Sequence, residues 1–344
     1  MSDLLVILGA GASYDALRQG AERPPLAADL FDPSYDEYQR NFPGVDGLRD
    51  TILGRMRQER GLEQILGDLA EISDENIIRQ LFEVPVYLKV LLSNFGTDNR
   101  AGTYDALITL IQERELSVTF VTLNYDTILD SAIERKYRTP IESMAGYIAS
   151  PDWNYIKMHG SVDWGYRLDI YGADGPMLHG NVSDYLDLLF AIYPVPRSSF
   201  ETAWLLPDTI SLSLDGALIY PALSIPTDRK GQPVCPAPHL DVLRATLESD
   251  PAILVVGNQG LDTDLMDLLR QSSRPLSRKP FHVVDPQNGA VVASRFSESL
   301  NRRGFSVPPD MGFREFVGSD AAERFFDEVR DASSSTDYLS PYRL

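Results

Sequence analysis

The stretch Leu4-Leu5-Val6-Ile7-Leu8-Gly9-Ala10-Gly11-Ala12-Ser13 decides the fold that we expect for this chain. Its first five residues form an apolar run that is too short for a buried helix, which predicts a buried parallel strand. Alternating glycines follow at once, in the setting where a backbone turn approaches a pyrophosphate at the start of a helix. The alternative is a strand exit that needs glycine only for tight packing, because Tyr14 replaces the third glycine of the dinucleotide fingerprint.

Similar short apolar runs recur along the chain, at residues 118–122, 155–158, 217–220, 252–256 and 281–284. Segments whose apolar residues have helical spacing lie between them, as in residues 62–70 and 128–133. Strands that alternate with helices predict an α/β fold, with a doubly wound, mainly parallel, Rossmann-like sheet and helical insertions.

The lengths of the intervals between strands predict the domain organisation. Residues 1–31 and 116–330 are expected to form one Rossmann-like domain, with a small helical or irregular lobe at about 166–214. The interval 32–115 is too long for a simple crossover and predicts an inserted helical module. The polar end, residues 331–344, is expected to be a flexible tail.

Composition excludes several classes of function. The chain has 344 residues, with 31 Lys and Arg against 50 Asp and Glu, and this net charge of -19 disfavours direct binding of nucleic acid. Cys235 is the only cysteine, so neither an intrachain disulfide nor a multi-cysteine zinc site is expected. Because the sequence shows no secretory signal and no apolar stretch of membrane-spanning length, we expect a cytoplasmic protein without membrane contact.

Polar side chains follow two of the predicted strands at their carboxyl ends, the edge where open α/β sheets bind ligands. In Thr122-Leu123-Asn124-Tyr125-Asp126, the candidate site residues are Asn124 and Asp126, although Asp126 could equally cap the next helix. His159 stands just after another strand with Gly160 behind it. An unperturbed histidine has a pKa of about 6.5, close to neutral pH, so His159 is the best candidate for a general acid or base. The alternative is that His159 is a structural residue.

A second glycine turn, Gly257-Asn258-Gln259-Gly260-Leu261-Asp262, also follows an apolar run. It can offer backbone amides and side-chain acceptors to a ribose or a phosphate. The last strand ends at Asp285, which could hold a ribose diol.

These four motifs, in this order, resemble those of the sirtuin superfamily: the glycine turn at 9–13, the Asn-x-Asp element at 124–126, His159-Gly160 and the later turn at 257–262. The chain departs from the protein-deacylating branch, because it lacks the four cysteines of the zinc ribbon and continues from the first turn as Tyr14-Asp15-Ala16-Leu17. It looks more like the sirtuin-like NAD hydrolases of bacterial antiphage defence.

The resemblance implies that NAD is the substrate, that no zinc is bound, and that the bond between nicotinamide and ribose is cleaved. It implies catalytic roles for Asn124, His159 and Asp126. It places the remaining contacts to NAD at these residues: Gly9, Ala10, Gly11, Ala12, Ser13, Asp15, Thr122, Tyr125, Gly160, Gly257, Asn258, Asp262 and Asp285.

Two other functions stay open at this point, an NAD-dependent protein deacylase and a non-catalytic sensor of NAD or ADP-ribose. The resemblance also implies control by self-assembly or by a separately encoded partner, such as a ring-forming ATPase. A homo-oligomer is therefore expected, and the lack of an arginine cluster at the strand ends favours NAD over NADP.

Overall fold

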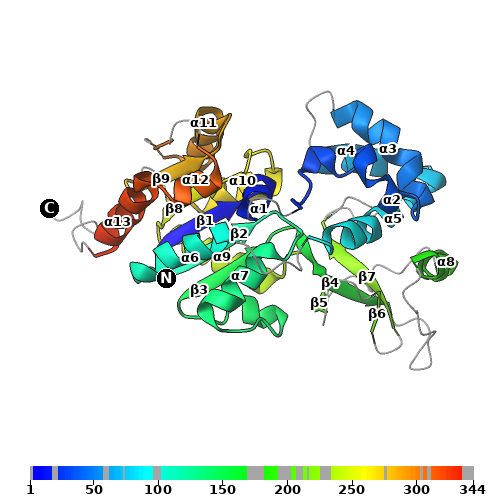
Figure 1. Ribbon diagram of the computed structural model, residues 1–344, viewed down its shortest axis with the longest axis horizontal. Coiled ribbons are helices and arrows are strands. Elements are labelled where there is room, and N and C mark those ends of the chain that lie inside the picture. Colours follow the sequence, from blue (N-terminus) through cyan, green and yellow to red (C-terminus); the bar gives the residue numbers. More distant parts are fainter. Residues whose placement is uncertain are drawn as a thin grey trace.

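A parallel sheet of five strands lies at the centre of the part of the chain that the computed structural model describes (Figure 1). The described residues are 3–17, 22–56, 62–72, 74–95, 102–168, 182–192, 203–206, 212–214, 217–224, 234–274, 277–302, 305–307 and 311–334. The strand order is β3-β2-β1-β8-β9, for β1 (Leu4–Leu8), β2 (Val118–Thr122), β3 (Trp153–Lys157), β8 (Ala252–Val256) and β9 (Phe281–Val284). All four pairings are parallel, and the direction of winding changes between β1 and β8. The predicted fold class is confirmed.

Helices cover both faces of this sheet, because successive side chains of a strand point to opposite faces. Leu4, Val6 and Leu8 of β1 belong to one hydrophobic cluster, whereas Leu5 and Ile7 belong to the other. The first cluster includes α1 (Ala10–Ala16), α6 (Gly102–Glu113), α7 (Ile128–Tyr137), α12 (Phe313–Val317) and α13 (Asp320–Ser334). The second includes α9 (Ala237–Glu248), α10 (Thr263–Ser272) and α11 (Gly289–Leu300).

A smaller antiparallel sheet continues directly from β3 through His159. Its order is β5-β4-β7-β6, for β4 (Gly160–Leu168), β5 (Trp204–Leu205), β6 (Ser213–Leu214) and β7 (Ala217–Leu223). The prediction of a parallel strand at 217–220 was therefore wrong, since β7 pairs antiparallel with β4 and β6. All seven residues of β7 are buried, and a strand buried on both faces has the continuous apolar sequence that is typical of parallel strands.

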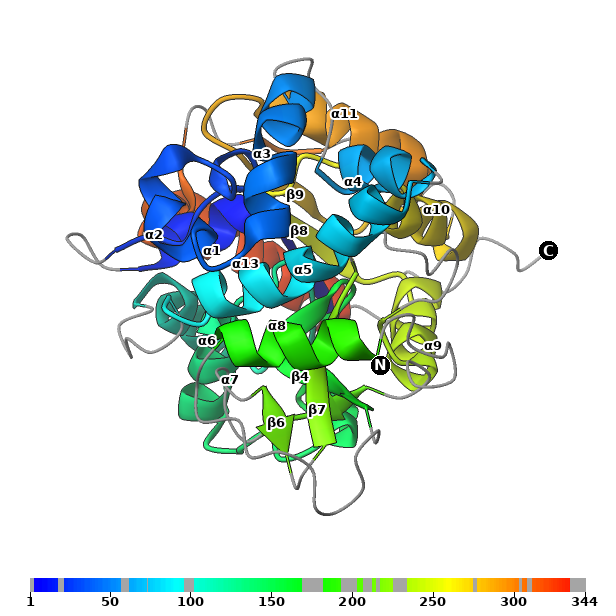
Figure 2. The ribbon, with the colours of Figure 1, turned by 90° about the vertical axis from the view of Figure 1, so that its right-hand side faces the viewer.

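Four helices lie beside this antiparallel sheet: α2 (Asp36–Gln39), α3 (Pro43–Met56), α4 (Leu62–Ala70) and α5 (Glu75–Leu92). Helix α5 packs onto β7 and β4, and α2, α3 and α4 pack against α5. Single 3-10 turns at Ala27–Asp29 and Pro33–Tyr35 precede these helices, and a third, Met144–Ile148, follows α7. Phe82 of α5 stacks on Tyr220 of β7 with ring centroids 4.5 Å apart. The Tyr220 hydroxyl donates to the Phe82 carbonyl at 3.0 Å. In Figures 1 and 2 these helices, the antiparallel sheet and α8 (Val182–Ala191) therefore form a second lobe beside the parallel sheet.

The predicted domain boundaries do not coincide with the boundaries of the observed helices and sheets. Helix α6 belongs to the expected inserted module at 32–115, yet it packs against α7 of the parallel-sheet domain. The expected small lobe at 166–214 shares its sheet with β7, outside that range. These boundaries stay predictions. Residues 331–334 of the expected tail are helical as the end of α13, and residues 335–344 lie outside the described ranges.

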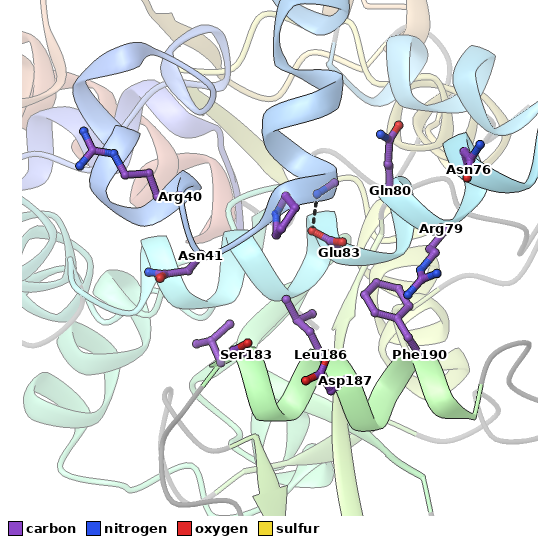
Figure 3. A pocket seen from close by; sticks show the side chains of 13 residues that line it. Arg40, Asn41, Asn76, Arg79, Gln80, Glu83, Ser183, Leu186, Asp187 and Phe190 are labelled. Carbon is purple, nitrogen blue, oxygen red and sulfur yellow. Dashed lines mark hydrogen bonds between the residues drawn. The ribbon is translucent and has the colours of Figure 1, made fainter.

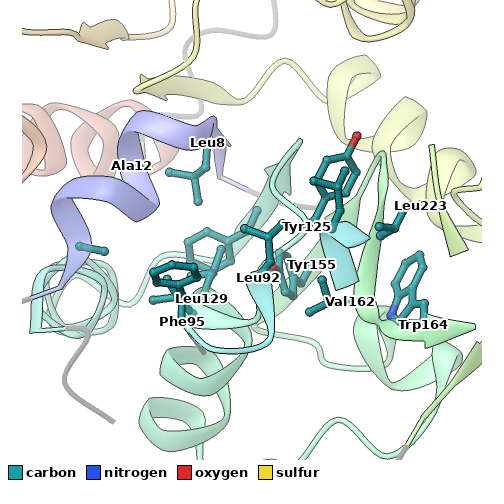
Figure 4. Packing of buried hydrophobic residues seen from close by; sticks show 14 of the residues in the cluster. Leu8, Ala12, Leu92, Phe95, Tyr125, Leu129, Tyr155, Val162, Trp164 and Leu223 are labelled. Carbon is teal, nitrogen blue, oxygen red and sulfur yellow. The ribbon is translucent and has the colours of Figure 1, made fainter. Parts of the chain in front are cut away.

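The end of α5 joins the two lobes. Leu92, the last residue of α5, and the nearby Phe95 belong to the same hydrophobic cluster as Leu129 of α7 and Ala12 of α1 (Figure 4). The buried Lys89 ammonium of α5 also donates to the carbonyl of Val162 in β4. The junction between the sheets, where His159 lies, is thus held from the helical side as well. Among the described helices, none has the length and apolar composition needed to cross a membrane.

Candidate functional site at the sheet edge

The two glycine turns meet directly at the switch point between β1 and β8. The Gly9 N–H donates to the Val256 carbonyl and the Gly11 N–H donates to the Gly257 carbonyl, both at 3.1 Å. A Cβ on Gly9 would lie 2.8 Å from the Asn258 Cα, and one on Gly257 would lie 2.8 Å from the Gly11 Cα. Gly257 also has φ +59°, which disfavours any residue with a side chain. Glycine is needed here so that the two backbones can touch.

This contact gives a packing reason for the first glycine turn, the alternative that the sequence left open. The N–H groups of Gly9 and Gly11 donate across the turns, and the Ala12 N–H donates to the Gly9 carbonyl at 2.9 Å. Three of the backbone donors expected to bind a pyrophosphate are therefore already paired within the protein. Ala10 and Ser13 complete the predicted turn, and they lie in the first helical residues of α1.

Asn124 is held at the end of β2 by the same turn. Its Nδ2 donates to the Gly9 carbonyl and to the Ser13 hydroxyl, each at 2.9 Å. The Ser13 hydroxyl donates in turn to Asp126 Oδ1 at 3.2 Å and lies 3.1 Å from the hydroxyl of the buried Tyr104. Because both amide hydrogens of Asn124 serve the protein, its Oδ1 is the atom that can accept a hydrogen bond from a ligand.

The buried Asp126 carboxylate holds the Ser13 hydroxyl that binds Asn124. Its Oδ1 also accepts the N–H of Ile128, the first residue of α7, at 3.0 Å, while the N-cap residue of this helix is Thr127. Burial raises the pKa of the Asp126 carboxyl, while the nearby Lys157 ammonium acts in the opposite direction. Asp126 thus reaches Asn124 through the Ser13 hydroxyl.

A buried ion pair fixes the loop that carries these residues. The Lys157 ammonium at the end of β3 is fully buried and donates to the Asp126 carbonyl at 2.8 Å. It pairs with Asp130 Oδ2 at 2.9 Å, and the hydroxyls of Tyr147 and Tyr155 donate to the same carboxylate at 3.1 and 3.0 Å. These contacts fix the positions of Lys157 and Asp130, and with them the Asp126 carbonyl. Removing either charge would leave the other one buried without compensation.

His159 meets Asp262 across the sheet edge. The His159 Nε2 lies 2.9 Å from Asp262 Oδ2, and the two side chains are only 7% and 14% exposed. The other oxygen, Oδ1, accepts the Leu265 N–H at 2.7 Å, so Asp262 is the N-cap of α10. Burial alone would raise the pKa of Asp262, but the hydrogen bond and charge of His159 and the Leu265 N–H outweigh burial and lower it.

The second turn and the end of β9 hold each other through side chains. Asn258 is buried; its Oδ1 accepts the Gly260 N–H at 2.8 Å, and its Nδ2 has no hydrogen-bond partner among the described residues. Gln259 Nε2 donates to Asp285 Oδ2 at 2.7 Å, and Asp285 Oδ1 accepts the N–H groups of Gln287 and Asn288. Asp285 is therefore occupied by the protein's own donors at the predicted ribose position.

The other predicted contact residues have structural partners. Asp15 Oδ2 accepts the Arg314 N–H at 2.8 Å, at the start of α12. Asp15 lies near the C-terminal end of α1, whereas Gly9 precedes the first residue of that helix. The Thr122 hydroxyl accepts the Asn124 N–H at 3.0 Å. The Tyr125 ring lies 6.2 Å from the His159 ring, measured between centroids. Gly160 has φ +83° and packs against the Ala222 carbonyl of β7, which turns the chain from β3 into the antiparallel sheet.

Sequence reasoning did not single out Tyr104, Asp130 or Lys157. For Lys157 a signal existed, since a lysine inside the apolar run Tyr155-Ile156-Lys157-Met158 indicates a buried partner. For Tyr104 there was none, because it reaches Ser13 over a sequence separation of 91 residues.

A large groove lies elsewhere, in the second lobe (Figure 3). It has a volume of ≈ 990 Å³ and lies between α3, α5 and α8. In this groove, Glu83 Oε2 accepts the Gly44 N–H at the start of α3 at 2.7 Å. The Arg79 guanidinium stacks over the Phe190 ring, 4.2 Å from the ring centroid. None of the predicted site residues lines this groove, so its size does not make it the candidate site.

No group of three or more His, Cys, Asp or Glu side chains within the described ranges is arranged to hold a metal ion. Cys235 is buried, and burial raises the pKa of its thiol to about 12, so it is a packed residue rather than a reactive thiolate.

Comparisons with known proteins give only distant matches. No protein-family model matches the chain, and no curated protein matches it. Among solved structures, a Sir2 complex with an inhibitor, 2'-O-acetyl-ADP-ribose and a deacetylated p53 peptide aligns over 94% of both chains, with 12% identity and a TM-score of 0.41. A Sir2 homologue bound to NAD aligns over 97% of this chain and 91% of its own, with 13% identity and a TM-score of 0.41. At this level of similarity these structures do not assign a role to any residue.

The contact between the glycine turns predicts that Gly257→Ala destabilises the protein by at least about 2 kcal/mol, through strain at positive φ and overlap with the first turn. Urea unfolding measures this loss. The matched control is Gly54→Ala, at an exposed position of α3 where an added Cβ meets nothing within 4 Å. It should stabilise α3 by about 0.5–1 kcal/mol. Equal unfolding midpoints for Gly257→Ala and the wild type would contradict the account of the turn.

Proposed function

We propose that this protein is an NAD hydrolase, which cleaves the bond between nicotinamide and ribose and releases nicotinamide and ADP-ribose. The main support is that Asn124 follows β2 at the same sheet edge as the His159–Asp262 pair, which joins the ends of β3 and β8. They lie at the carboxyl edge beside the switch point, where open α/β sheets bind nucleotides. Their order along the chain is that of the sirtuin motifs.

The chemistry of this reaction requires the kinds of polar groups that lie at the carboxyl edge of the parallel sheet. Nicotinamide is a cationic ring in NAD and leaves as a neutral base, so no general acid is required. The sugar passes through a transition state with oxocarbenium character, which calls for oriented dipoles and a positioned water. The C1′–N bond breaks with its electrons passing to the ring nitrogen, and a bond forms between C1′ and the water oxygen.

Asn124 and His159 take the direct roles in this proposal. Asn124 Oδ1 accepts a hydrogen bond from the water or from a ribose hydroxyl, because its Nδ2 is held by Gly9 and Ser13. His159 accepts the proton that the water loses. Asp126 acts through Ser13 to keep the Asn124 amide in place.

The remaining contacts to NAD are proposed around the two turns. The buried Asn258 Nδ2 offers a donor to a ribose or phosphate oxygen, since leaving such a group unpaired costs about 1–3 kcal/mol. Asp285 and Asp15 need to exchange a protein partner before they could bind NAD, so we assign them to holding Gln259 and α12.

The test is a time course of the purified chain with NAD, followed by chromatography of nicotinamide and ADP-ribose. Asn124→Ala and His159→Ala should each lower the rate of nicotinamide release by about 100- to 10,000-fold, the usual loss for a positioned acid–base group. Asn94→Ala is the matched control, because Asn94 is exposed at the end of α5 and donates only to carbonyls of its own helix. A loss of only twofold in His159→Ala would remove His159 from the mechanism.

The same assay separates the deacylase alternative. A deacylase given an acetylated peptide would form O-acetyl-ADP-ribose and would release little nicotinamide without the peptide. Appearance of that product in place of ADP-ribose would contradict the hydrolase proposal.

We extend the proposal to the cell: the chain acts as an NAD-depleting effector of bacterial antiphage defence, assembled as a homo-oligomer and held silent by a partner such as a ring-forming ATPase. The resemblance of its motifs supports this role. During phage infection, cells with the wild-type chain should lose NAD and cells with His159→Ala should keep it. Equal NAD levels in both strains, or a monomer by light scattering at every concentration, would contradict this extension.

A further inference from the structure

The His159–Asp262 contact spans the proposed site rather than lying beside it. In the sheet order β3-β2-β1-β8, two strands separate the strand before His159 from the strand before Asp262. The side chains nevertheless meet at 2.9 Å, although β2 and β1, which are followed by Asn124 and Gly9, lie between these two strands. The pair is therefore a direct link between the two halves of the doubly wound sheet.

We propose that Asp262 is a positioning residue that fixes the ring tautomer of His159, so that Nδ1 is the atom that takes the proton from the attacking water. This inference rests on the proposed function. In the hydrolysis step, the water oxygen bonds to C1′, the nicotinamide nitrogen leaves with the bonding electrons, and the water proton moves to His159 Nδ1 and then to solvent.

The chemistry of the carboxylate determines the tautomer. An ionised carboxylate accepts hydrogen bonds and donates none, so the His159 Nε2 at 2.9 Å must carry the hydrogen. The pKa of Asp262 is lowered because the contacts from His159 and the Leu265 N–H outweigh its burial, which keeps this carboxyl ionised at neutral pH. A neutral imidazole with its hydrogen on Nε2 has its basic lone pair on Nδ1.

The carboxylate is also unable to turn away from the ring. Asp262 Oδ1 accepts the Leu265 N–H at 2.7 Å at the start of α10, so one oxygen binds the helix while the other binds the histidine. The positive end of this helix favours the charged carboxylate. The orientation of the His159 ring is thus tied to a helix of the opposite half of the sheet.

Two substitutions separate positioning from helix capping. In Asp262→Asn the side-chain oxygen can still accept the Leu265 N–H, but the amide hydrogens face His159 and favour the tautomer with its hydrogen on Nδ1. Asp262→Ser keeps a good N-cap and removes the group that touches the ring. The control is Asp74→Asn, which makes the same change at the N-cap of α5, where Asp74 accepts the N–H groups of Asn76 and Ile77.

The first readout is kcat for nicotinamide release by the full chain. The proposal predicts a fall of about 100- to 10,000-fold in Asp262→Asn, as expected when a catalytic histidine is held in the wrong tautomer, and a smaller fall in Asp262→Ser, where neither tautomer is fixed. KM should change far less, and kcat of Asp74→Asn should stay within twofold of the wild type. An unchanged kcat in Asp262→Asn, beside an active wild type, would overturn the role of Asp262 and leave the proposed function standing.

The second readout needs no turnover. Nitrogen NMR of the 15N-labelled histidine rings, with His159 assigned by comparison with His159→Ala, reports which ring nitrogen carries the hydrogen. The wild type should have it on Nε2, and Asp262→Asn should have it on Nδ1. A wild type with the hydrogen on Nδ1 would overturn the inference whatever its activity, whereas the expected tautomers in a protein that never hydrolyses NAD would count against the proposed function instead.

Discussion

The backbone contact between the two glycine turns is the constraint on which the rest of the site depends. Gly9 follows the first strand, Gly11 lies in the first turn of α1, and Gly257 follows the neighbouring strand β8. The Gly9 N–H donates to the Val256 carbonyl and the Gly11 N–H donates to the Gly257 carbonyl, both at 3.1 Å. Any side chain at Gly9 or Gly257 would push the two turns apart. The doubly wound sheet reverses its winding between β1 and β8. The contact between the turns therefore sets the distance between the site residues at the strand ends of the two halves.

Polar networks then fix the side chains that this contact brings near. Ser13, one turn of helix after Gly9, holds the amide of Asn124 and the carboxylate of Asp126. The buried Lys157–Asp130 pair holds the backbone of Asp126 from the other side. These groups are costly to bury and are satisfied only in one arrangement, so they select a single orientation for Asn124. His159 receives its orientation from Asp262 in the same way.

The sequence predicted those parts of the fold that depend on local pattern. The strands at 4–8, 118–122 and 252–256 were identifiable because each short apolar run was followed within two residues by a glycine or a polar residue. The strand at 217–220 was predicted to be parallel, which was wrong, because complete burial gives an antiparallel strand the composition of a parallel one. The residues at the strand ends were also predictable, since a parallel sheet gathers its carboxyl ends at one edge.

The contacts among those residues could not be predicted in the same way. Asp262 was expected to bind the ligand, and its contact with His159 joins residues 103 positions apart through the sheet topology. The sequence also allowed the first glycines to serve either a ligand or packing, and only the backbone positions show that their N–H groups already donate within the protein. A motif gives the residue types at a site, whereas the partner of each polar atom depends on tertiary structure.

The central claim is that NAD binds at the sheet edge between Asn124 and His159, above the glycine turns. A crystal structure of His159→Ala soaked with NAD tests it most directly, since the substitution slows turnover without changing the strands that form the edge. The account predicts the nicotinamide ribose within hydrogen-bond distance of Asn124 Oδ1 and the adenosine side along the second turn, near Asn258. NAD in the groove between α3, α5 and α8 instead, with the sheet edge unoccupied, would contradict it.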